Sequence, residues 1–124
     1  MKTDIREHLN RAGEFLAGAE VLLNNNLPAI ALGRAYYAMF HAATAALLTR
    51  AIERSSHHAL IAAFGQYIVK PGLVDKSYQA HFRDAFVARI EGDYGSFASA
   101  DEKKVKVHIE RARQFVQICR GLCE

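Results

Sequence analysis

Hydrophobic residues recur every three or four positions in five segments of the chain, and no segment alternates as a strand does. The first segment, residues 3–23, carries apolar side chains from Ile5 to Leu23 on one side of a helical period. Polar residues fill the other side, as is typical of an amphipathic helix. Three asparagines at 24–26 follow and predict a turn, because asparagine tolerates turn conformations.

The second segment, residues 27–53, is apolar nearly all round. A helix with little polar surface is buried on most sides, so this segment predicts the central helix of the fold. Pro28 falls in the expected first turn, where its missing N–H costs nothing, and Asn26 is the candidate cap before it.

Three further helices follow from helix-start and helix-stop signals. Ser55 or Ser56 is expected to cap a helix at 57–69, which the Pro71-Gly72 pair ends. A helix at 75–91 runs into a loop with two glycines at 92–95, and residues 99–102 form a capping box for the last helix. The chain is therefore predicted to be all-α, an antiparallel helical bundle of about five helices, with residues 1–124 as a single domain.

Composition and charge narrow the class of protein. No stretch reaches the ~18 apolar residues of a membrane span and no secretion signal opens the chain, so a cytoplasmic protein is expected. The six histidines and two cysteines lack the spacing of a metal-ligand set, so neither a metal nor another cofactor is predicted. The net charge of +3 permits nucleic-acid binding but requires a local pocket for it.

The candidate chemistry lies on the central helix. Arg34, Tyr37 and His41 share one face of an otherwise apolar segment. A buried arginine without a partner is costly, so Arg34 is expected either to pair internally with a carboxylate such as Asp93 or to belong to a binding site. The histidines at positions 8, 81 and 108 have polar neighbours and are expected to be solvated.

Three blocks, residues 33–43, 56–64 and 89–95, closely resemble the HEPN domain, specifically its small stand-alone branch. Arg34-x-Tyr36-Tyr37-Ala38-x-Phe40 and, later, Arg89-x-x-x-Asp93-Tyr94 carry most of the similarity, which covers nearly the whole chain. The resemblance implies an all-helical bundle that commonly forms homodimers, with the polar motifs of two copies meeting in a cleft.

Many HEPN proteins are metal-independent ribonucleases, and many are paired with a nucleotidyltransferase-like antitoxin. The ribonuclease signature is an arginine followed a few residues later by a histidine, which Arg34 and His41 satisfy. In the ribonuclease branches the signature usually lies later and often ends in His-x-Tyr, where this chain has Gly92-Asp93-Tyr94.

The leading hypothesis is a HEPN toxin-like protein that binds RNA or a nucleotide in a dimer cleft and cleaves RNA without metal. Arg34 and Arg89 would bind phosphate, His41 or His57 would transfer protons, and Asp93 with Tyr94 would orient the arginines beside Tyr37. The alternative, which the missing histidine at position 92 favours, is a non-catalytic interaction module that docks a nucleotidyltransferase. A metal-dependent enzyme is disfavoured, because Glu-x-x-His ligand pairs are absent from the sequence.

Overall fold

The chain is a bundle of helices with no strand in the part that the computed structural model describes, residues 2–93 and 101–124. The elements in chain order are α1 (Lys2–Asn24), α2 (Pro28–Leu48), α3 (His57–Phe64), the π-helical turn η1 (Gly65–Val69), α4 (Ser77–Asp93) and α5 (Glu102–Leu122). The predicted fold class, an all-α bundle of about five helices, is confirmed.

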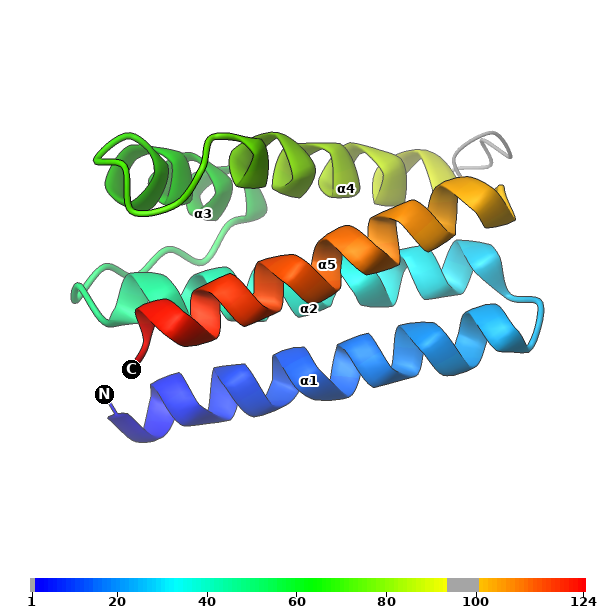
Figure 1. Cartoon of the computed structure of the whole chain (residues 1–124), viewed down its shortest axis with the longest axis horizontal. Coiled ribbons are helices and arrows are strands. Elements are labelled where there is room, and N and C mark those ends of the chain that lie inside the picture. The colour runs from blue at the N-terminus through cyan, green and yellow to red at the C-terminus, as the bar shows by residue number, and fades with distance from the viewer. Residues whose placement is uncertain (1, 94–100) are drawn as a thin grey trace.

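Helix α2 lies at the centre of the bundle and packs against each of the other four α-helices. Figure 1 shows α1 antiparallel to α2 along one side, α4 on the opposite side, and α5 crossing in front. Alanine dominates the buried positions of α2, and Ala12 and Ala19 of α1 are also fully buried. Small side chains let the helix axes approach closely, which explains why α1 and α2 form a tight hairpin.

Aromatic side chains fill the space between α2 and the remaining helices. Tyr36 of α2, Phe82 of α4 and Phe115 of α5 are fully buried and pack against one another in that order, with ring centroids 6.0 and 5.0 Å apart. Glu20 on α1 also pairs with Arg113 on α5 at the surface. Together these contacts fix the positions of α1, α2 and α4, the three helices that matter for the site.

One predicted helix end and one predicted cap are wrong for a shared reason. The second helix ends at Leu48 rather than 53, because Ala51 adopts a left-handed conformation (φ 58°) and Ile52 N–H bonds to Leu47 C=O at 3.1 Å. This is a Schellman ending, in which glycine is the usual left-handed residue. Asn26 (φ 63°) ends α1 in the same way, so it does not cap α2, whose first turn has no side-chain cap.

The helix cap predicted for α3 is confirmed, whereas α5 is capped by a residue other than the predicted one. The Ser56 hydroxyl accepts a 3.1 Å hydrogen bond from Ala59 N–H at the start of α3. At α5 the cap is Asp101, whose carboxylate accepts from Lys103 N–H at 2.8 Å. The expected cap Ser99 lies outside the described residues.

Candidate functional site

Two arginines from different helices line one surface cavity. Arg34 comes from the middle of α2 and is exposed, whereas Arg89 comes from the end of α4 and is half-buried. The cavity has a volume of about 300 Å³. Its lining residues are Ala29, Ile30, Gly33, Arg34, Tyr37, Arg89 and Gly92. The arrangement therefore brings together Arg34, Tyr37 and Arg89, three of the residues that the sequence suggested.

Arg89 is held against a pair of tyrosine rings. Its guanidinium carbon lies 5.0 Å from the ring centroid of Tyr37 and 5.8 Å from that of Tyr36. A guanidinium over the face of a ring is attracted by the ring's quadrupole. Arg89 is thus positioned by residues of α2, although it belongs to α4.

His57 is the histidine nearest to these rings. It is the first residue of α3, where the Ser56 cap fixes the chain, and its ring centroid lies 5.9 Å from that of Tyr37. Burial lowers the pKa of His57, and the positive charges of Arg89 and His58 lower it further. The imidazole of His57 is therefore neutral at pH 7 and lies close to the Arg89 cation.

Tyr36 is a functional candidate that the sequence assigned only to the core. Its ring is fully buried as expected, but its hydroxyl lies 2.6 Å from Nδ1 of His57. Burial raises the pKa of Tyr36, so the phenol stays protonated. The contact orients the His57 ring and leaves Nε2 as the nitrogen that could face a ligand. A tyrosine at a fully apolar position was the available signal, because its hydroxyl needs a partner.

His41 does not line the cavity and instead belongs to a contact between α1 and α2. Its Nδ1 lies 3.0 Å from Nδ1 of His8, and its ring stacks on Phe15 with centroids 5.4 Å apart. Burial, with the nearby charges of His8 and Arg11, lowers the pKa of His41 to about 4.

The expectation that the histidines at 8, 81 and 108 are solvated is wrong, since all three are partly buried.

The expected burial of Arg34 is also wrong. Its side chain is exposed, and its guanidinium carbon lies 5.9 Å from the Phe15 ring centroid. Among the described side chains no carboxylate forms an ion pair with it. The suggested partner, the Asp93 side chain, and the whole of Tyr94 lie outside the described part of the chain. The guanidinium of Arg34 is therefore exposed, and it forms no ion pair with the described helices.

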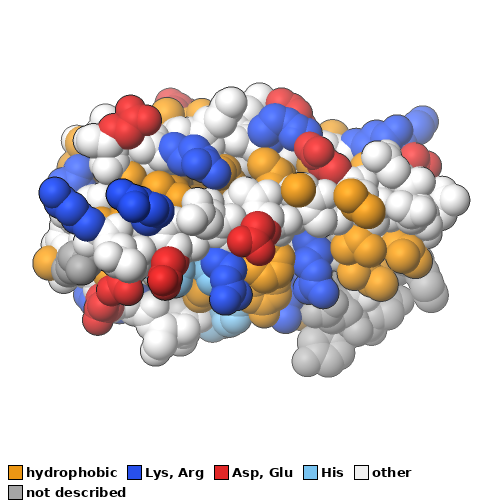
Figure 2. Space-filling view, turned by 90° about the horizontal axis from the view of Figure 1, so that it is seen from below, with side chains coloured by type: hydrophobic (Ala, Val, Ile, Leu, Met, Phe, Trp, Pro, Cys, Tyr) orange, Lys and Arg blue, Asp and Glu red, His pale blue; other side chains and the backbone are white. Residues whose placement is uncertain are grey.

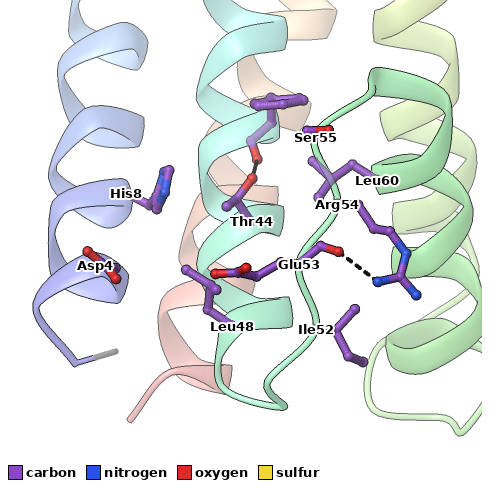
Figure 3. Close-up of a pocket in the computed structure, with 10 residues that line it drawn as sticks. Asp4, His8, Thr44, Leu48, Ile52, Glu53, Arg54, Ser55 and Leu60 are labelled. Atoms are coloured by element: carbon purple, nitrogen blue, oxygen red, sulfur yellow. Dashed lines mark hydrogen bonds between the residues drawn. The ribbon is translucent and has the colours of Figure 1, made fainter.

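A larger cavity of about 550 Å³ lies between the start of α1, the second half of α2 and the segment that follows α2 (Figure 3). Its lining residues are Asp4, His8, Phe40, Thr44, Leu48, Ile52, Glu53, Arg54, Ser55 and Leu60. Arg54 donates to its neighbour's carbonyl, Glu53 C=O, at 2.7 Å. Two carboxylates disfavour an anion here, so a phosphate fits the arginine cavity better.

The described residues also show whether a metal site or a membrane-spanning helix is present. No group of three or more His, Cys, Asp or Glu side chains among them is arranged to hold a metal ion. None of the helices in the described ranges is both long and apolar enough to cross a membrane.

Comparison with known proteins identifies the family. The model of the HEPN domain matches residues 5–122. A "UPF0332 protein" of Thermotoga maritima is 36% identical over 114 residues, which cover 92% of this chain and 86% of that protein. A protein of Methanocaldococcus jannaschii named "Putative toxin MJ0605" is 33% identical over 94% of this chain and 89% of its own length. The sequence resemblance is thus confirmed, and this chain belongs to the HEPN domain family.

Proposed function

We propose that this protein is toxin-like and binds the phosphate of RNA or of a nucleotide in the cavity between α2 and α4. The observation that carries the proposal is the convergence of Arg34 and Arg89 on one cavity of about 300 Å³. Guanidinium groups offer several fixed N–H donors and bind phosphate oxygens bidentately. Tyr37, which also lines the cavity, can stack on a base or a ribose beside that phosphate.

The same groups support a second step, the cleavage of RNA without a metal. In this reaction the 2′-hydroxyl loses its proton to a base and attacks phosphorus. The P–O5′ bond then breaks to give a cyclic phosphate, and the leaving 5′-oxygen takes up a proton from the protonated base or from water to become a 5′-hydroxyl. His57, neutral and close to Arg89, is the favoured proton acceptor through Nε2, provided that its Nδ1–H donates to Tyr36. Arg34 and Arg89 would stabilise the phosphorane charge.

The assembly belongs to the proposal as well. Ile30 lines the cavity and is 48% exposed, and Ile90, next to Arg89, is 37% exposed. Apolar residues beside a charged cavity suit a second copy of the chain, whose cavity would then face the same cleft. A nucleotidyltransferase-like antitoxin is the proposed protein partner, in keeping with the word toxin in the names of two relatives.

Binding can be tested with variants of exposed arginines. We expect Arg34→Ala to weaken binding of a fluorescent RNA oligonucleotide by about tenfold or more, because a charge-assisted contact is lost. Arg83→Ala removes the same charge from another side of α4 and should bind like the wild type. Circular dichroism checks that each variant is folded. Equal binding by the wild type and Arg34→Ala would contradict the assignment.

Cleavage requires a separate assay with excess EDTA. Wild-type protein should produce fragments with cyclic phosphate ends, and His57→Gln should abolish them while RNA binding is retained. Loss of cleavage in a folded His41→Gln variant, with His57→Gln still active, would move the proton-transfer role to His41. Binding without any cleavage by the wild type would instead support the non-catalytic docking module.

A further inference from the structure

We propose that the RNA bound at the Arg34–Arg89 cavity is single-stranded and continues onto α1, where Arg11 and Phe15 bind the adjoining nucleotide. This inference rests on the proposed function and extends it. It identifies the substrate class and two further binding residues, neither of which the sequence motifs include.

A second cavity adjoins the first at Arg34. It has a volume of about 260 Å³ and is lined by Arg11, Glu14, Phe15, Gly18 and Arg34. Arg34 lines both cavities, so the two hollows lie on either side of one guanidinium-bearing side chain. A single phosphate or mononucleotide would occupy one hollow and leave the other empty.

Cationic and aromatic side chains lie close together across the three helices. Phe15 lines the second cavity with Arg11 and Arg34, and its ring centroid lies 5.9 Å from the Arg34 guanidinium carbon and 5.8 Å from the Tyr37 ring centroid. The guanidinium carbon of Arg89 lies 5.0 Å from the ring centroid of Tyr37. On the face shown in Figure 2, orange side chains lie between blue ones beside pale-blue histidines. We name the series Arg11, Phe15, Arg34, Tyr37 and Arg89 the arginine–aromatic row.

The arginine–aromatic row suits an unpaired strand better than a duplex. Proteins that bind single strands combine cationic grooves along the backbone with aromatic rings on which bases stack. The rings of Phe15 and Tyr37 are both partly exposed, and neither could reach bases stacked inside a double helix. Glu14 adds a carboxylate to the second cavity, which disfavours phosphate there but can accept a hydrogen bond from a base amino group.

The test compares the binding of a short and a long ligand to the purified protein. Fluorescence anisotropy would measure binding of a labelled mononucleotide, a hexanucleotide and a hairpin duplex. The hexanucleotide and the duplex carry 2′-O-methyl groups at every position, so they cannot be cleaved by 2′-hydroxyl attack. Arg11→Ala removes an exposed charge, and Phe15→Leu keeps apolar volume but removes the ring. Arg6→Ala is the matched control, since it removes an exposed arginine from another side of α1.

We expect the hexanucleotide to bind about fivefold or more weakly to Arg11→Ala and to Phe15→Leu, with mononucleotide binding unchanged. Arg11→Ala should also reduce the slope of log K against log salt by about 0.7, the value for one phosphate contact on a single strand. Arg6→Ala should bind both ligands like the wild type. These results together would support the row as a single-strand site.

Other outcomes separate the two proposals. If Arg34→Ala weakens the binding of both the short ligand and the hexanucleotide, but Arg11→Ala and Phe15→Leu bind the hexanucleotide normally, the extension onto α1 is wrong. The proposed phosphate-binding cavity would then still stand. Equal or tighter binding of the hairpin duplex would also overturn the single-strand proposal. If the wild type binds none of the three ligands, the proposed function fails, and the extension fails with it.

Discussion

His41 and His57 have different neighbours, yet burial lowers the pKa of both imidazoles. His57 contacts Tyr36 and lies close to Arg89, whereas His41 contacts His8 across the α1–α2 interface. The sequence treated the two residues as equal candidates for proton transfer. Their surroundings distinguish them, because the His57 ring lies beside Tyr37, which contacts Arg89, whereas the His41 ring stacks on Phe15, which contacts Arg34.

The His8–His41 contact predicts a pH dependence of stability. The pKa of His41 is about 4 in the folded chain and about 6.5 in an unfolded one. Between these values the unfolded state binds more protons, so the free energy of unfolding should fall as the pH falls from 6.5 towards 4. His41→Gln should show a shallower fall in urea unfolding measured at pH 7.5, 5.5 and 4.5. If the free energy of unfolding fell equally with pH in the wild type and in His41→Gln, His41 would not be the cause of the pH dependence.

A second prediction concerns the Tyr36 hydroxyl. Tyr36→Phe keeps the ring in the core but removes the 2.6 Å contact with His57, so we expect the free energy of unfolding to fall by about 1 kcal/mol. Thermal and urea unfolding would measure the loss. In the cleavage assay the variant should lose activity at constant RNA affinity, because the His57 ring is no longer oriented. Unchanged stability and activity would show that the contact is unimportant.

At the scale of elements, helix endings decide what lies beside the site. Because α2 ends at Leu48, the following residues form an irregular segment that turns the chain back to α3 and delivers His57 next to Tyr36. A helix continuing to residue 53 would extend the chain about 8 Å further along its axis. The left-handed Ala51 makes this turn possible, although alanine is a poor residue for that conformation.

Ala51→Gly should therefore stabilise the protein. Glycine adopts the left-handed conformation without steric cost, and Ala51 is exposed, so we expect a gain of about 0.5–1 kcal/mol in urea unfolding. Ala17→Gly is the matched control, because Ala17 is exposed within α1 and glycine there should cost about 0.5–1 kcal/mol. Destabilisation by both substitutions would contradict the role assigned to Ala51.

At the scale of the whole molecule, the binding face is assembled from α1, α2 and α4. Arg34 and Tyr37 come from the central helix, while Arg11 and Phe15 depend on how closely α1 packs against it. Ala12 and Ala19, both fully buried, permit that close packing. The geometry of the arginine–aromatic row thus depends on small core residues that touch no ligand.

Ala19→Leu tests this dependence. The added carbons have no space between α1 and its neighbours, so we expect a loss of about 1–3 kcal/mol in the free energy of unfolding. Displacement of α1 should also weaken hexanucleotide binding more than mononucleotide binding. Ala17→Leu, at an exposed position of the same helix, should stay within about 0.5 kcal/mol of the wild type. An equally stable Ala19→Leu variant would show that this interface is not tightly packed.

The sequence by itself determined the helical class, the central position of α2, a serine cap before α3 and the family, because these follow from local hydrophobic periodicity and short motifs. It also pointed to Arg34, Tyr37 and Arg89, while the assignment of residues 1–124 to one domain stays a prediction. Only the tertiary structure decided that α2 ends in a left-handed alanine, that Arg34 is exposed, and that the His57 ring lies beside Tyr37 while the His41 ring stacks on Phe15. The physical reason is that side chains far apart in sequence meet through helix packing, and spacing along one helix carries no information about its neighbours.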